Sequence, residues 1–183
     1  MILASGSPRR AALLRAAGFD FEVRPSGADE WPYAGGPPAR YAEALARAKV
    51  AAVPGDVVVG ADTVVVVDGN VLGKPVDPEE AAAMLRKLSG RTHDVITAIA
   101  VRKGQVVRSG HARSRVTFRP LSDQDIRDYV ASGEPHDKAG AYAYQGGAAD
   151  FTVDLEGDSD TVIGLPIAVL NELLAEPPVA GHR

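Results

Sequence analysis

The longest apolar run of this chain lies at residues 57–67 and contains one carboxylate. The run reads Val-Val-Val-Gly-Ala-Asp-Thr-Val-Val-Val-Val, and continuous β-branched residues are typical of strands buried on both faces. Burying an ionised carboxylate there is costly unless it meets water, a cation or a hydrogen-bond donor. Asp62 is therefore either a turn or cap carboxylate after Gly60, or a catalytic or metal-binding group. We expect two core strands that meet at residues 60–63.

Residues that cap helices mark where the helices begin and end. After a short apolar strand at residues 2–4, Ser7 suits the N-cap, Pro8 the first helical position and Gly18 the left-handed residue past the helix end. Similar capping signals and amphipathic spacing predict further helices at residues 38–53, 77–89 and 122–132, and a turn leading into a last helix within residues 163–175.

Further strands are predicted where apolar residues alternate or run together between turn residues. Such segments lie at residues 19–23, 71–72, 92–102, 105–118 and 151–155. Asp68-Gly69-Asn70 is a hairpin signal between the run at residues 57–67 and the strand at residues 71–72. Residues 137–147 are rich in small side chains, so the backbone there could approach a ligand or another element closely.

Composition narrows the class of protein. With 183 residues and 45% hydrophobic residues, the chain can form one domain with a real core, which we place at residues 1–175, followed by a frayed tail at residues 176–183. It has no cysteine, which excludes disulfides, thiolate zinc sites and cysteine nucleophiles. No signal peptide or membrane span is visible, so we expect a soluble cytoplasmic protein. The four histidines lack ligand spacing and are read as incidental.

Charge points to small polyanions rather than to nucleic acid or membranes as partners. The net charge of −4 argues against broad electrostatic binding of a nucleic-acid polymer. At the first helix, exposed backbone N–H groups together with Arg9 and Arg10 would suit a phosphate. Alternatively, both arginines are merely solvated. The adjacent acids Asp29 and Glu30 in a Pro- and Gly-rich loop could equally be solvated, and Lys49 could simply favour a helix C-terminus.

Several motifs, taken in order, resemble the Maf family, whose members are also called septum formation proteins. These motifs are Ser-Gly-Ser-Pro-Arg-Arg at residues 5–10, Gly-Ala-Asp-Thr at 60–63, Gly-Lys-Pro at 73–75, Lys-Leu-Ser-Gly at 87–90, Asp-Lys-Ala-Gly-Ala-Tyr at 137–142 with Gln-Gly at 145–146, and Gly-Leu-Pro at 164–166. Each motif alone is modest, whereas the ordered set from residue 2 to about residue 174 is specific.

The resemblance implies a fold and an activity. The expected fold is mixed α/β with a mixed sheet, two-lobed with a central cleft, and similar to that of inosine triphosphate pyrophosphatases. The expected activity is hydrolysis of a nucleoside triphosphate between its α- and β-phosphates, which releases the monophosphate and pyrophosphate. A divalent cation, Mg²⁺ or Mn²⁺, is the implied cofactor, and homodimers are often found in the family. Such enzymes can clear non-standard nucleotides.

The resemblance also implies roles for individual residues of this chain that match the motifs of the family. Asp62 matches the catalytic acid that activates water, and Glu30 matches an acid associated with the metal, so both are expected catalytic and metal-binding groups. Phosphoryl transfer needs charge neutralisation and alignment more than covalent help, which suits carboxylates opposite a basic cluster. The expected substrate-binding residues are Ser5, Arg9, Arg10, Lys49, Lys74 and Lys138.

Three positions bear on the choice of base. The family resembles two groups here: one acts on dTTP and UTP and carries Arg, Thr and Gln, and the other acts on 7-methyl-GTP and carries Trp, Gln and Glu. This chain has Arg9, Thr63 and Gln145, so it matches the pyrimidine group. The amide of Gln145 can both donate and accept, which suits the O4 and N3–H edge of thymine or uracil.

Two departures from the family and two alternatives remain. The usual Ala-Tyr-Gly-Ile-Gln-Gly reads Ala-Tyr-Ala-Tyr-Gln-Gly at residues 141–146, and the common Gly-Ser-Tyr reads Gly-Asp-Ser at residues 157–159, which adds acid at Asp158. The alternatives are a 7-methyl-GTP pyrophosphatase and a nucleotide-sensing regulator of cell division or septum formation. Whether Asp62 acts as the general base itself or through the metal is open, as is the number of ions.

Overall fold

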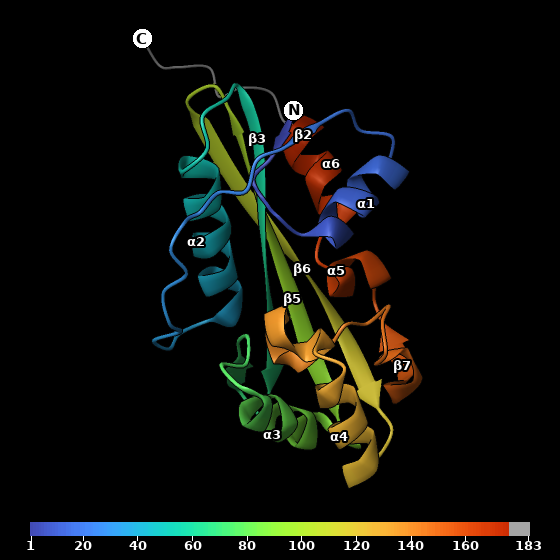
Figure 1. The fold of residues 1–183 in the computed structure, drawn as a ribbon. Coiled ribbons are helices and arrows are strands. Elements are labelled where there is room, and N and C mark those ends of the chain that lie inside the picture. Colours follow the sequence, from blue (N-terminus) through green and yellow to red (C-terminus); the bar gives the residue numbers. More distant parts are fainter. Residues whose placement is uncertain (176–183) are drawn as a thin grey trace. The chain divides into compact units, whose positions relative to one another are not determined.

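A computed structural model of the chain describes residues 1–175 and contains a mixed seven-stranded sheet (Figure 1). The strands follow the order β2-β1-β3-β5-β6-β7, with β4 paired to β3. Strand β1 runs parallel to β2 and β3, whereas β4 is antiparallel to β3 and β7 is antiparallel to β6. Their bounds are β1 Ile2–Leu3, β2 Glu22–Val23, β3 Val57–Val67, β4 Asn70–Leu72, β5 Thr92–Lys103, β6 Val106–Phe118 and β7 Thr152–Glu156.

Three helices begin where capping residues predict them. Ser7 accepts from the Arg10 N–H, Asp77 accepts from the Glu80 N–H, and Ser122 and Asp125 form a capping box. The bounds are α1 Pro8–Ala16, α2 Pro38–Ala51, α3 Pro78–Leu88, α4 Asp123–Ala131, α5 Ser159–Ile163 and α6 Ile167–Ala175, with short 3₁₀ turns η1 Glu134–Asp137, η2 Ala139–Ala141 and η3 Ala149–Phe151. Along residues 1–175, no helix is both long and apolar enough to cross a membrane.

Within residues 1–175, which we predict to be a single domain, the chain divides into two compact units. Unit 1 contains residues 1–62, residues 97–112 and the segment that begins at Gly164, and unit 2 contains residues 63–96 and 113–163. Strands β3, β5 and β6 contribute residues to both units. The tail predicted at residues 176–183 lies outside the described residues.

Unit 1 has its apolar core on the side of the strands that carries α1 and α6. Leu14 of α1 and Leu170 of α6 pack with Leu3, Val59 and Ile99 of the strands, and all are fully or almost fully buried. Helix α2 lies on the other side of the same strands (Figure 1). Unit 1 is therefore a sheet segment covered by helices on both faces, which explains the continuous apolar run of β3.

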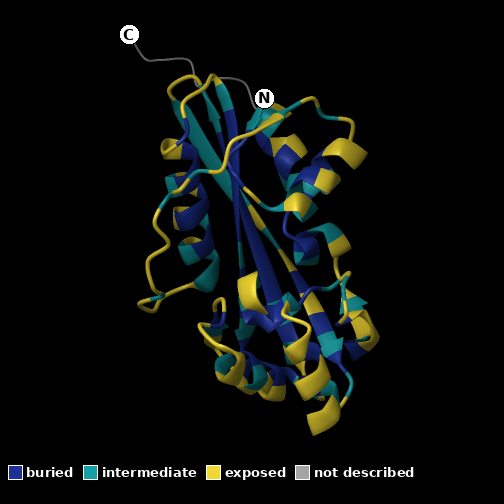
Figure 2. Ribbon diagram, viewed as in Figure 1, coloured by how far each residue is buried: buried dark blue, intermediate teal, exposed yellow. Residues whose placement is uncertain are grey.

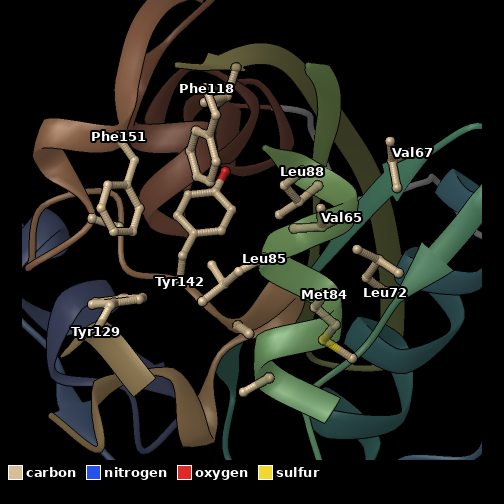
Figure 3. Close-up of a cluster of buried hydrophobic side chains, with 14 of the residues drawn as sticks. Val65, Val67, Leu72, Met84, Leu85, Leu88, Phe118, Tyr129, Tyr142 and Phe151 are labelled. Carbon is tan, nitrogen blue, oxygen red and sulfur yellow. The ribbon is translucent and has the colours of Figure 1, made fainter. Parts of the chain in front are cut away.

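Unit 2 has a separate core that is rich in aromatic rings. Phe118 of β6 makes edge-to-face contacts with Tyr142 and Phe151, and Tyr129 of α4 packs edge-to-face on Phe151. Leu85 and Leu88 of α3 complete this cluster (Figure 3). Figure 2 colours the ribbon by how far each residue is buried. The backbone that follows α4 is therefore anchored to a rigid aromatic core.

One expectation about secondary structure is wrong, and one helix was missed. Strand β3 runs unbroken from Val57 to Val67, so the predicted pair of strands meeting at residues 60–63 is one strand, and Asp62 is neither a turn nor a cap residue. A cation lies beside the buried carboxylate, as described below. Helix α5 was not predicted, because its five residues are too few to show a helical period.

Candidate active site

The alternation of side chains along β3 determines where Asp62 points. Val59 and Ala61 belong to the apolar core of unit 1, and successive side chains of a strand face opposite sides. Gly60 and Asp62 therefore face α2. A Cβ on Gly60 would lie 2.7 Å from the Ala46 carbonyl oxygen and 2.9 Å from Val50 Cγ2, both on α2. Because Gly60 has no side chain, α2 can approach β3 closely at a position two residues before Asp62.

This close approach places Lys49 of α2 on the Asp62 carboxylate. The Lys49 Nζ lies 2.6 Å from Asp62 Oδ1 and 2.9 Å from Glu30 Oε1, and it also donates to the Ala61 carbonyl oxygen at 3.4 Å. Lys49 is 8% exposed and Asp62 is 7% exposed, whereas the Glu30 side chain is 38% exposed. One buried ammonium therefore joins two carboxylates that are far apart in the sequence.

The pKa of Asp62 is raised above its ordinary value. Burial is the largest cause, and the nearby Glu30 carboxylate acts in the same direction. The Lys49 ammonium and the Arg10 guanidinium oppose the shift without cancelling it. A carboxylate with a raised pKa is a stronger base than an exposed aspartate, which is the property that a general base needs.

Ser5 and Arg10 form a second polar group in unit 1. Arg10 Nη1 donates to Ser5 Oγ at 3.3 Å, Arg10 Nε donates to the Gly164 carbonyl oxygen at 2.8 Å, and the Ser7 N–H donates to Ser5 Oγ at 3.2 Å. Burial lowers the pKa of Arg10, and the Asp62 charge opposes that shift. Arg10 is thus a half-buried cation within electrostatic reach of the carboxylates, and Arg9, which is also half-buried, precedes it at the start of α1.

Tyr41 holds the loop that carries Glu30. Its hydroxyl donates to the Trp31 carbonyl oxygen at 2.7 Å, directly after Glu30, and its ring packs edge-to-face on Tyr33 of the same loop. Burial raises the Tyr41 pKa, and the charges of Asp62 and Glu30 raise it further. Tyr41 lies in the helix predicted at residues 38–53 and is not among the predicted site residues. A tyrosine eight residues before Lys49 on the same helix is a weak signal for this role.

The other predicted site residues belong to unit 2. Thr63 follows Asp62 in β3 and is half-buried, whereas Lys74 and Gln145 are exposed. Lys138 Nζ donates to Asp137 Oδ1 at 2.6 Å and to the Glu134 carbonyl oxygen at 2.8 Å. Asp158, the added acid, is exposed, and its carbonyl oxygen accepts from Ser114 Oγ at 2.9 Å. Substrate binding by these residues stays a prediction.

Comparison with known proteins identifies the family. The sequence profile described as "Maf-like protein" matches residues 1–177. The chain belongs to the Maf family. A dTTP/UTP pyrophosphatase of Pelotomaculum thermopropionicum is 49% identical over 95% of this chain and 94% of that protein. A protein of the same name from Moorella thermoacetica is 50% identical over 96% of this chain and 93% of that protein. A solved HAM1 protein from Coxiella burnetii is 16% identical, with a TM-score of 0.40 over 81% of this chain and 89% of that chain.

Membership of the Maf family confirms two predictions made from the sequence. The ordered motifs identified the family, and the mixed α/β fold with a mixed sheet is present. Within the Maf fold of this chain, Ser5, Arg10, Glu30, Lys49 and Asp62 all belong to unit 1. Polar contacts of 2.6–3.3 Å join these five residues into two groups, and the charges of Asp62 and Arg10 interact between the groups.

The carboxylates of this Maf protein fit a magnesium or manganese ion that also uses substrate oxygens. Mg²⁺ usually takes one or two carboxylates and completes its octahedron with water and phosphate oxygens. Glu30 and Asp62 provide two such carboxylates, and the Lys49 ammonium contacts both of them. Among residues 1–175 there is no cluster of three or more histidines and acids that could hold a metal by itself. A metal ion bound here would therefore need water or substrate oxygens to complete its coordination.

Proposed function

We propose that this Maf protein hydrolyses dTTP and UTP, and related or modified pyrimidine nucleotides, to the monophosphate and pyrophosphate. Two relatives that are 49% and 50% identical over almost the whole chain carry the name dTTP/UTP pyrophosphatase. The observation that carries the proposal is the contact of the buried Lys49 ammonium with Asp62 and Glu30. A basic carboxylate beside cations is the arrangement that water activation at a phosphate requires.

The chemistry assigned to this chain is a proton transfer coupled to displacement at phosphorus. The oxygen of a water molecule bonds to a phosphorus of the α–β anhydride, the bridging P–O bond breaks, and pyrophosphate and the monophosphate leave. Asp62 accepts the proton of that water. Its raised pKa favours this role. Arg10 and Lys49 stabilise charge on the phosphate oxygens, and Ser5 provides a hydroxyl to them.

A divalent cation fits the same carboxylates. Glu30 and Asp62 would hold Mg²⁺ or Mn²⁺, and the bound ion would neutralise negative charge on the phosphates. The Lys49 ammonium offers three donors on a flexible stem. It can therefore pass from the carboxylates to a phosphate oxygen without a change of the backbone.

Base selection is assigned to Arg9, Thr63 and Gln145. These residues match the pyrimidine group of the family and not the 7-methyl-GTP group. The Gln145 amide can accept from the N3–H of thymine or uracil and donate to O4. A site that is built to hydrogen-bond one base edge discriminates against a base that leaves those groups unpaired.

The alternatives differ in what they require of the site. A 7-methyl-GTP pyrophosphatase would carry Trp, Gln and Glu where this chain has Arg9, Thr63 and Gln145. A nucleotide-sensing regulator of cell division would only have to bind a nucleotide, and it would not need a basic carboxylate that accepts a proton.

We further infer that the enzyme acts on free nucleotides in the cytoplasm, as a monomer or a homodimer.

A substrate panel tests the proposal. Purified protein with Mg²⁺ is expected to release pyrophosphate from dTTP and UTP faster than from ATP, GTP or 7-methyl-GTP. Omission of the metal, or its removal with a chelator, is expected to stop the release. Equal turnover of the whole panel, or none, would overturn the proposal, and a preference for 7-methyl-GTP would favour the alternative enzyme.

A further inference from the structure

In unit 2, the loop that carries Gln145 is held on both sides of that residue by side chains. The Ala143 N–H donates to the Tyr129 hydroxyl at 2.9 Å, and the Gly147 N–H donates to Glu134 Oε2 at 2.9 Å. Gln145 lies between these two hydrogen bonds and is exposed. The loop is thus fixed at its two ends while its central side chain remains accessible.

The two glycines of the loop are what allow this close contact. A Cβ on Gly146 would overlap the Glu134 carboxylate, and a Cβ on Gly147 would lie 3.1 Å from a ring carbon of Tyr129. The Gly146 N–H also donates to the Ala143 carbonyl oxygen at 3.1 Å, which closes a tight turn around Gln145. The loop therefore lies directly against Tyr129 and Glu134, as the small side chains of the segment suggest.

The residues that hold the loop are themselves well anchored. Tyr129 is 6% exposed and packs edge-to-face on Phe151, with ring centroids 5.3 Å apart (Figure 3). The Glu134 N–H donates to Ser132 Oγ at 3.2 Å, and Lys138 Nζ donates to the Glu134 carbonyl oxygen. Just before the loop, the Tyr142 hydroxyl hydrogen-bonds to His93 Nε2 at 2.8 Å. Tyr129 thus belongs to the buried core of unit 2, whereas Glu134 is half-buried and is held by these hydrogen bonds.

We propose that Tyr129 and Glu134 are positioning residues for base selection, because they fix the loop from which Gln145 reads the base. The inference rests on the proposed function of Gln145. Neither side chain has to touch the nucleotide. Reading one edge of a base requires a donor and an acceptor held at hydrogen-bond distance, and a displacement of about 1 Å is enough to lose much of the discrimination. A hydrogen bond from the backbone to a side chain at each end of a short turn limits such displacement.

The test compares UTP with CTP, since the two bases have the same size and differ in the edge that Gln145 would read. Tyr129→Phe removes only the hydroxyl, and Glu134→Ala removes the carboxylate. Each is expected to lower kcat/KM for UTP about tenfold, equivalent to about 1.4 kcal/mol, and to change kcat/KM for CTP by less than about threefold. Glu134→Gln keeps an oxygen that can accept from the Gly147 N–H, so it is expected to retain most of the preference.

Two controls separate positioning from general damage. Hydrogen exchange of the loop at residues 143–147 is expected to become faster in Tyr129→Phe and Glu134→Ala, whereas exchange in β3 stays unchanged. In a Gln145→Ala background, Tyr129→Phe is expected to cause no further loss of the UTP preference, because coupled residues are not additive. An equal loss for UTP and CTP in the single variants would overturn the inference, since that result indicates a structural effect only.

Failure of the inference can be told apart from failure of the proposed function. If the wild-type protein prefers UTP and Gln145→Ala removes that preference, but Tyr129→Phe and Glu134→Ala keep it, then only the positioning role is wrong. If the wild-type protein hydrolyses UTP and CTP equally, or neither, then the base-reading role of Gln145 is wrong and the positioning role falls with it.

Discussion

The Lys49 Nζ lies 2.6 Å from Asp62 Oδ1, so the buried acid of β3 is paired with a cation from α2. Glu30 shares the same ammonium at 2.9 Å. Pairing offsets the cost of burying a carboxylate, although the net shift of the Asp62 pKa is still upward. The pair thus keeps a basic carboxylate inside the protein, and we propose that the substrate phosphates compete with it for the Lys49 ammonium.

Asp62→Asn tests the role of that carboxylate. The amide cannot accept a proton, so hydrolysis of UTP is expected to fall by roughly 10²- to 10⁴-fold, the usual range for loss of general-base catalysis. Binding of UTP, measured by calorimetry, is expected to remain detectable, because the cations stay in place. Asp56→Asn, at an exposed position of the same unit, is the matched control with unchanged activity. Full activity of Asp62→Asn would remove Asp62 from the mechanism.

Tyr41→Phe tests whether the loop with Glu30 must be held in place. Loss of the hydrogen bond to the Trp31 carbonyl oxygen costs about 0.5–1.5 kcal/mol. The Mg²⁺ concentration for half-maximal activity is therefore expected to rise roughly 3- to 10-fold, while activity at saturating Mg²⁺ changes little. Tyr33→Phe serves as the control, since its hydroxyl bonds to Gly36, farther along the same loop. An unchanged Mg²⁺ requirement in Tyr41→Phe would show that Glu30 needs no such support.

Gly60→Ala tests the approach of α2 to β3. The new methyl group would meet the Ala46 carbonyl oxygen at 2.7 Å, so α2 must shift, at a cost of about 1–3 kcal/mol in the free energy of unfolding. Urea denaturation measures that cost. Because the shift moves Lys49 away from Asp62, kcat is also expected to fall. Gly73→Ala is the stability control, since no atom lies within 4 Å of a Cβ there. Wild-type stability and kcat in Gly60→Ala would contradict the packing argument.

His93 makes the stability of unit 2 dependent on pH. Burial lowers its pKa from 6.5 to about 4, and it is 2% exposed. Between these values the unfolded chain binds a proton that the folded chain does not, so stability falls as the pH falls from about 6.5 to about 4. The loss contributed by His93 is at most about 3 kcal/mol. Unfolding in urea at several pH values measures it.

A variant isolates the His93 contribution. His93→Phe is expected to flatten the stability curve between pH 4.5 and 6.5, though it lowers stability at pH 7 by about 1–3 kcal/mol because the Tyr142 hydroxyl loses its partner. His136→Gln, at an exposed position, is expected to leave the curve unchanged. A slope that persists in His93→Phe would assign the pH dependence to other groups.

The sequence predicted the features that depend on neighbouring residues. Ser7, Asp77 and Ser122 cap helices as expected, and Asp68-Gly69 forms the hairpin turn with positive φ at both residues. Such signals are local, so they survive without knowledge of the fold. The ordered motifs also gave the family and its mixed α/β fold, although the boundaries between units could not be read from them.

Features that depend on contacts far apart in the sequence could not be predicted. Within the unbroken strand β3, Asp62 is paired with Lys49, which lies thirteen residues before it, and the sequence does not show that this pair meets. Tyr41 and His93 looked like an ordinary helix position and an incidental histidine, because their hydrogen-bond partners, Trp31 and Tyr142, are brought to them by tertiary structure. Tertiary pairing of this kind leaves no local pattern.

The two-residue strand β1 has a consequence for how the enzyme tolerates change. Ile2 and Leu3 pair with Val58 and Val59 of β3, and the Ala4 N–H donates to the Val59 carbonyl oxygen at 2.7 Å. This ladder places Ser5 and Asp62 by counting residues, so one inserted or deleted residue in positions 57–61 would turn Asp62 toward the apolar core and Ala61 toward Lys49. The pairing of this two-residue strand with β3 thus fixes the register of the site, and we expect an insertion or deletion in positions 57–61 to disrupt the enzyme as severely as replacement of its acids.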